Sequence, residues 1–66
     1  MDVYKVIFEN NTAVSAVPAP ELMHSAIGLN QDKETVQWLA LECPDAKTAI
    51  EIGNKVVQIV WVYEAA

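Results

Sequence analysis

The sequence predicts a small α+β domain with the element order β-β-α-β-α-β, in which two helices cover one face of a four-stranded sheet. Two patterns predict this fold class: alternating apolar residues joined by turn signals, and an apolar repeat of helical spacing near residue 50. A chain of 66 residues forms one domain, here residues 1–66. A domain of this size buries only about 60% of its unfolded surface, so we expect a marginal core.

The first two strands are predicted as a hairpin over residues 3–9 and 12–17. In the first strand, Tyr4, Val6 and Phe8 share one face. The intervening pair Asn10-Asn11 tolerates the positive φ that two-residue hairpin turns require. Strict alternation divides the second strand into two faces, Ala13, Ser15 and Val17 against Val14 and Ala16.

A short helix is predicted over residues 21–27. Pro20 suits its beginning and Gly28 its end. Helical spacing pairs Leu22 with Ala26 and Met23 with Ile27 in a buried stripe. A polar loop follows over residues 30–33.

Residues 35–42 fit two structures. As a strand, they place Val36, Trp38 and Ala40 on one face and Leu39 and Leu41 on the other. As a helix, they place Val36, Leu39, Ala40 and Cys43 on one stripe. The strand is preferred because it forms a compact β-α-β unit with the segments that follow, and the helix is the alternative.

The main helix is predicted to begin at Pro44 and to end at Gly53-Asn54. Apolar residues recur there with helical spacing, at Ala46, Ala49, Ile50, Gly53 and Val57. Another face carries Lys47, Glu51 and Lys55. Pro44 suits the first helical position, and Gly53-Asn54 offers a natural end.

A strand is predicted over residues 56–63, where β-branched and aromatic residues dominate. Alternation gives two faces, Val57, Ile59, Trp61 and Tyr63 against Gln58, Val60, Val62 and Glu64. We expect the first face to pack against the helices. The second face supplies the candidate subunit interface, formed by Gln58, Val60 and Val62.

Hydrophobic residues make up 53% of the chain and charged residues 20%, which is more apolar than an average soluble domain. A small domain has little interior in which to bury this excess. We therefore expect a homodimer or higher homo-oligomer, with another protein as a second kind of partner.

The chain carries nine acidic residues, four lysines and no arginine, for a net charge of −5. Nucleic-acid binding draws on clustered cations, and these lysines are scattered, so no direct nucleic-acid binding is expected. An acidic inhibitor that mimics nucleic acid is an alternative use of this charge. Apolar tracts shorter than roughly 20 residues, one cysteine and no basic leader predict a cytoplasmic protein without a membrane contact.

Cys43 is the candidate reactive thiol, because it precedes the main helix and a helix N-terminus lowers a thiol pKa. Glu42 and Asp45 flank it and oppose the thiolate, so the competing interpretation is a small buried residue. His24 is interpreted as a surface residue, because a metal site needs several converging ligands. No catalytic residue, metal site or cofactor is expected.

These patterns favour a small non-enzymatic protein that acts through protein interaction or oligomerisation. One alternative is a module that binds a small apolar ligand at a subunit interface. An enzyme that uses Cys43 or His24 is a third class of hypothesis. The sequence carries no motif that identifies a partner or a ligand.

Overall fold

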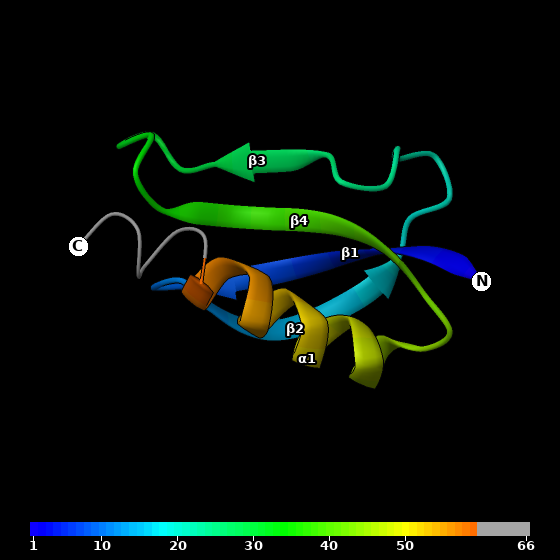
Figure 1. The fold of residues 1–66 in the computed structure, drawn as a ribbon. Helices are drawn as coiled ribbons and strands as arrows, with labels where there is room; N and C mark the ends of the chain where they lie inside the picture. The colour runs from blue at the N-terminus through cyan, green and yellow to red at the C-terminus, as the bar shows by residue number, and fades with distance from the viewer. Residues whose placement is uncertain (60–66) are drawn as a thin grey trace.

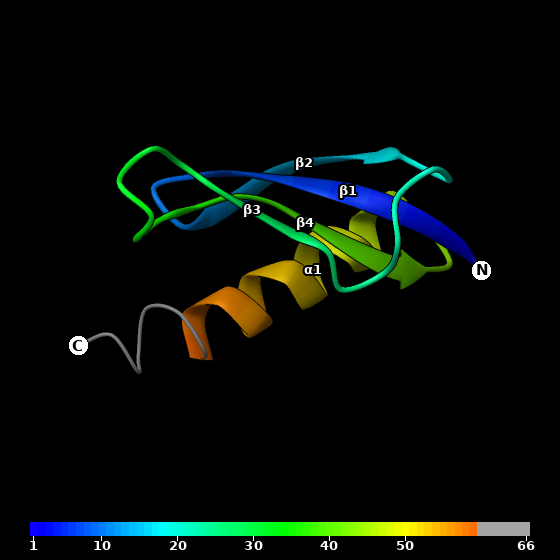
Figure 2. The same cartoon turned by 90° about the horizontal axis from the view of Figure 1, so that it is seen from above.

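The computed structural model describes residues 1–59, in which four strands are followed by one helix. The strands form a single antiparallel sheet in the order β2-β1-β4-β3 (Figure 1). The helix packs on one face of the sheet, which gives two layers (Figure 2). The elements are β1 (Asp2–Glu9), β2 (Thr12–Pro18), β3 (Ile27–Leu29), β4 (Val36–Cys43) and α1 (Ala46–Val56). A small α+β domain on a four-stranded sheet is confirmed, whereas the predicted order with two helices is wrong.

The hairpin of β1 and β2 is confirmed, and its turn has the backbone that the two asparagines predicted. Asn10 and Asn11 have φ values of 52° and 60°, in the left-handed region that a two-residue hairpin turn requires. Val6 and Phe8 are buried in the core that β1 shares with α1, and Tyr4 packs against the same core. The predicted common face of Tyr4, Val6 and Phe8 is therefore confirmed, and it is the face toward the core.

A bulge in β2 changes which of its side chains face the core. The register with β1 shifts between Ile7 and Phe8, which leaves Val14 as an extra residue on β2. Ala13 and Ala16 therefore both pack in or against the core. Strict alternation had placed these two alanines on opposite faces.

The predicted helix over residues 21–27 is wrong, and its last residue begins β3. Ser25 has a φ of 71°, which interrupts a right-handed helix. The backbone bonds to β4 instead: Ser25 N–H donates to Ala40 O at 2.7 Å, and Ala40 N–H donates to Ala26 O at 2.9 Å. Met23, an expected member of the buried stripe, is 80% exposed. Pairing with β4 satisfies backbone groups that the ends of a short helix leave without partners.

β4 adopts the preferred strand and not the alternative helix. Leu39 and Cys43 pack in the core beside α1, and Trp38 lies on the opposite face with Lys5, whose Nζ is 5.3 Å from the indole centroid. Val36 packs in the core with Leu39, although alternation placed it on the face of Trp38. The cause is a second register shift, in the pairing of β4 with β3.

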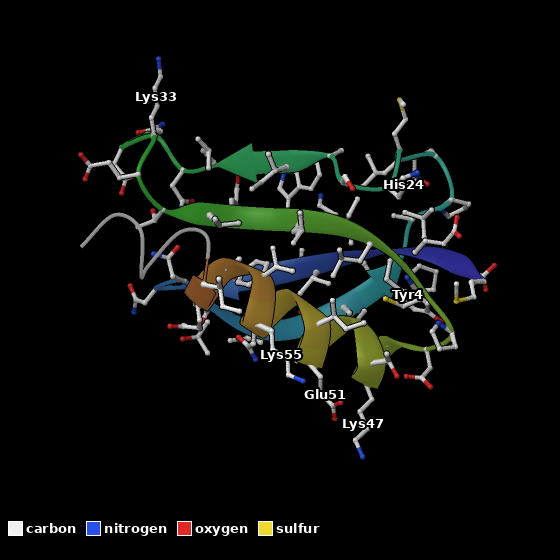
Figure 3. The ribbon with its side chains drawn as sticks, viewed as in Figure 1. Tyr4, His24, Lys33, Lys47, Glu51 and Lys55 are labelled. Carbon is white, nitrogen blue, oxygen red and sulfur yellow. The ribbon has the colours of Figure 1, made fainter. Side chains whose placement is uncertain are left out.

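The main helix is confirmed, but it begins later than predicted. Asp45 caps its N-terminus by accepting a hydrogen bond from Thr48 N–H at 2.7 Å, so Pro44 precedes the helix. The predicted stripe faces the sheet, with Ala49, Gly53 and Val57 buried and Ala46 and Ile50 half-buried. Lys47, Glu51 and Lys55 project away from the sheet (Figure 3).

The predicted helix end at Gly53-Asn54 is wrong, and so is the predicted beginning of a strand at Val56. α1 continues to Val56, and residues 57–59 form a π-helical turn. Gly53 allows close packing, because a Cβ there would lie 3.1 Å from Val6 Cγ1 and 3.3 Å from Phe8 Cζ. Residues 60–63 of the predicted strand lie outside the described residues.

Side-chain hydrogen bonds join the second half of α1 to the hairpin. Asn54 Oδ1 accepts from Ala13 N–H at 2.7 Å, and Gln58 Nε2 donates to Asn11 O at 3.1 Å. Asn11 Oδ1 in turn accepts from Val36 N–H at 2.9 Å, which ties the turn to the start of β4. These bonds give Asn54 a partner in the sheet, and the helix continues past it.

The Asp45 cap makes part of the stability dependent on pH. Hydrogen bonds from Thr48 hold the pKa of the Asp45 carboxyl below its usual value. The charged Asp45 carboxylate therefore contributes fully to the free energy of unfolding above the unfolded-state pKa of about 3.9. This contribution is lost as the pH falls through the lower folded-state pKa. Asp45→Asn keeps an uncharged cap, so we expect wild type to have the higher urea midpoint at neutral pH.

Urea unfolding of both proteins at several pH values tests this expectation. The advantage of wild type should shrink as the pH falls below about 4, because the carboxyl then becomes neutral in both the folded and the unfolded state. The other carboxyls titrate in the same way in both proteins, so their effects cancel when the stability of Asp45→Asn is subtracted from that of wild type. An advantage that persists unchanged in acid would contradict the assignment.

Candidate interaction surface

α1 covers part of the face of the sheet on which it lies. A helix with its side chains is about 10–12 Å across, whereas four strands spaced about 4.8 Å apart form a wider surface. α1 packs against β2, β1 and β4, and β3 lies beyond it (Figure 1). Within residues 1–59, the β3 side of this face therefore has no covering helix.

Five aliphatic side chains are exposed on this side of the molecule. Two come from β3, and three come from α1 and the turn that follows it. They are Ile27 (40% exposed), Leu29 (37%), Ile52 (39%), Val56 (37%) and Ile59 (63%). We call these five residues the helix–β3 surface.

The register of β3 places its two exposed residues on the helix side of the sheet. Ile27 pairs with Leu39, and Leu29 pairs with Val36. Directly paired residues of an antiparallel sheet point to the same face. Leu39 and Val36 belong to the core that contains residues of α1, so the side chains of β3 lie on that face as well.

The three helical residues lie on the flank of α1 that points toward β4 and β3. Asn54 marks the opposite flank, because its side chain bonds to Ala13 of β2. Residues two positions away along a helix are rotated by about 200°, which places Ile52 and Val56 across the helix from Asn54. Ile59 follows Val56 by three positions and continues this stripe.

The sequence contains a signal for part of this surface. Ile52, Val56 and Ile59 recur at i, i+4 and i+7, a second apolar stripe beside the buried one. The β-branched run after Val56 assigned two of these residues to a strand, so the stripe was missed. The position of β3 depends on long-range pairing with β4, for which its three residues carry no local signal.

The predicted subunit interface is placed only in part. Gln58 is exposed, and its side-chain amide bonds to Asn11 O within the same chain. Val60 and Val62 lie outside the described residues, so that prediction is untested for them.

The other face of the predicted strand was expected to pack in the core, and its two described residues differ in burial. Val57 is 1% exposed and belongs to the core, as predicted. Ile59 is 63% exposed, contrary to the prediction. Trp61 and Tyr63 lie outside the described residues.

The face of the sheet opposite α1 is a second candidate surface (Figure 2). By alternation it includes Val3, Lys5 and Ile7 of β1 and Trp38 of β4, all of them half-buried. We call these four residues the bare sheet face. The Trp38 indole lies so close over Gly28 that an added Cβ would overlap it. The Trp38 ring therefore packs against Gly28, and the Lys5 ammonium lies over the same ring.

Cys43, the candidate reactive thiol, is 1% exposed and packs in the core at the end of β4. Burial raises the pKa of the Cys43 thiol, and the nearby carboxylates of Asp45 and Glu42 raise it further. The thiolate is the reactive form of cysteine. Both observations favour the competing interpretation, a small residue that fills the corner between β4 and α1.

We expect Cys43 to react slowly with iodoacetamide near neutral pH. Its rate in the native protein should be at least about tenfold below that of the urea-unfolded protein at the same pH, because burial and a raised pKa both limit attack by the thiolate. Mass spectrometry of timed samples measures both rates. Equal rates would show an accessible thiol and restore Cys43 as a candidate site.

His24 lies in the exposed connection between β2 and β3, and its Nδ1 is 3.4 Å from Ser25 Oγ (Figure 3). Within residues 1–59, no three His, Cys, Asp or Glu side chains gather as a possible metal site. No helix in the same part of the chain combines the length and the apolar character needed to cross a membrane.

Comparison of the chain with protein-family models, with curated proteins and with solved structures finds no match.

Proposed function

We propose that this chain is a small non-enzymatic interaction protein that self-associates through an apolar contact. The observation that carries the proposal is the helix–β3 surface, where five exposed aliphatic side chains border the uncovered part of one sheet face. Contiguous apolar patches of several hundred Å² on soluble proteins commonly mark interaction sites.

The perturbed carboxyls of the described residues have structural causes, which supports a role without catalysis. The pKa of Asp32 is lowered by hydrogen bonds from the backbone of Glu34 and Thr35 and from the Thr35 hydroxyl. These bonds close the loop between β3 and β4. Asp45 caps α1 in the same manner. Catalytic groups more often show shifts caused by desolvation together with a charged partner in a cleft.

Analytical ultracentrifugation over a wide concentration range tests the proposal. We expect a reversible equilibrium between a 7.3 kDa monomer and a dimer or larger species, with the larger species favoured at higher concentration. A monomer that persists at millimolar concentration would contradict self-association.

A further inference from the structure

We infer that the helix–β3 surface binds a second copy of this chain around a two-fold axis, with the apolar flank of each α1 packed against the other copy. This inference rests on the proposed self-association and adds the location and symmetry of the contact. In such an isologous dimer, the same five residues contribute from both copies.

The first argument is that α1 leaves part of the sheet uncovered in each copy. Within residues 1–59, the sheet has one helix on its apolar side, and this helix packs against β2, β1 and β4 and leaves β3 largely uncovered. A second copy carries what the first lacks, a helix with an exposed apolar stripe. Each copy offers both a helix flank and an uncovered strand, so the surface is complementary to itself.

The second argument is charge. The charged residues of α1 lie outside the helix–β3 surface, although the chain has a net charge of −5. Lys47, Glu51 and Lys55 all project away from the sheet (Figure 3). Two copies can therefore meet without placing like charges in contact, and their long-range repulsion is screened by salt.

The third argument is the alternative contact. Packing two bare sheet faces together would cover Lys5, whose ammonium is already placed over Trp38 near the middle of that face. Desolvating an ammonium is unfavourable unless it gains a charged partner. The helix–β3 surface imposes no such cost.

The area of the helix–β3 surface indicates how tightly two copies should bind. Five partly exposed aliphatic side chains make a patch on the order of a few hundred Å². Twice that area is at or below the lower end of specific protein interfaces, which is typical of weak and transient contacts. We therefore expect a reversible dimer in rapid exchange with monomer.

The experiment compares substitutions of opposite charge on and off this surface. Val56→Asp and Ile27→Lys change the helix–β3 surface from two different elements, and Val17→Asp and Val14→Lys change valines of β2 that are each 48% exposed. Each Asp or Lys variant on the surface thus has a control with the same change in net charge. Circular dichroism establishes that each variant is folded, and sedimentation at about 0.05 M and 0.5 M NaCl measures its dimer dissociation constant.

We expect Val56→Asp and Ile27→Lys each to raise the dissociation constant at least about tenfold, while both β2 variants stay close to wild type. Wild-type dimerisation should strengthen with salt, because screening reduces the repulsion between two acidic copies. If one of these two surface variants is unfolded, the dissociation constant of the other decides the outcome.

Four results would overturn the inference. Val17 pairs with Lys5 and therefore points to the same side as the bare sheet face. If Val17→Asp dissociates the dimer and Val56→Asp does not, the contact is on that side of the sheet. If the dimer persists in every variant, the contact lies elsewhere and only the proposed self-association survives. If wild-type dimerisation weakens with salt, the contact is ionic. A wild type that is always monomeric rejects the proposed function together with this inference.

Discussion

Phe8→Ala is expected to leave the domain largely unfolded at room temperature. Phe8 is 4% exposed and lies in the core between β1 and α1, with Val6 and Gly53 as neighbours. Truncating a buried phenylalanine to alanine costs about 3–5 kcal/mol through lost burial and the cavity that remains. A domain of this size has a total stability near the low end of about 5–15 kcal/mol, so the loss removes most of it.

Urea denaturation followed by far-UV circular dichroism measures this effect. Val14→Ala is the control on the same hairpin, because Val14 is 48% exposed and exposed substitutions change the free energy of unfolding by about 0.5 kcal/mol or less. A Phe8→Ala protein with the wild-type urea midpoint would show that α1 does not pack over β1 as described.

Gly53→Leu is expected to have the second largest effect, because α1 lies close to β1 at this residue. A Cβ at Gly53 meets Val6 Cγ1 at 3.1 Å and Phe8 Cζ at 3.3 Å, and both neighbours are buried. A larger side chain must push the helix off the sheet, and overpacking of this kind costs about 1–3 kcal/mol or more. The same shift would stretch the hydrogen bond between Asn54 Oδ1 and Ala13 N–H.

The control is Ile52→Leu, which changes the adjacent exposed position and should leave the urea midpoint close to wild type. Gly53→Ala should fall between the two, because alanine gains about 1 kcal/mol of helix propensity over glycine and thereby offsets part of the crowding. A Gly53→Leu protein as stable as wild type would contradict the close approach of α1 to β1.

The elements predicted correctly are those whose signals are local. Asn10-Asn11 predicts its own turn because asparagine tolerates positive φ, and the turn fixes the pairing of β1 with β2. The stripe through Ala49 and Val57 predicts the buried face of α1 because that spacing repeats over several turns. In each case the local preference and the final packing agree.

The errors arise where tertiary contacts override a local preference. Val56 and its neighbours have the composition of a strand, but helix propensities differ by less than about 1 kcal/mol between ordinary residues. The bonds of Asn54 to Ala13 and of Gln58 to Asn11 favour the helical path. Gly53 resembles a helix end in sequence, whereas in the fold its missing side chain makes room for β1.

The candidate site follows the same rule. Helical spacing of Ile52 and Val56 was present in the sequence, but a stripe indicates a surface only after the helix is known to continue. The contribution of β3 could not be predicted, because Ile27 and Leu29 gain their orientation from pairing with β4. The two register shifts, at Val14 and in the β3–β4 pairing, likewise depend on the packed sheet.

The β2 edge has a consequence for whether copies of this chain can join strand to strand. An open edge strand normally offers a row of free donors to which another strand can add. Along β2 this row is broken, because Ala13 N–H is held by Asn54, the bulge at Val14 disturbs the register, and Pro18 has no N–H to donate. Growth strand by strand is therefore hindered at this edge, even though no residue of β2 is charged.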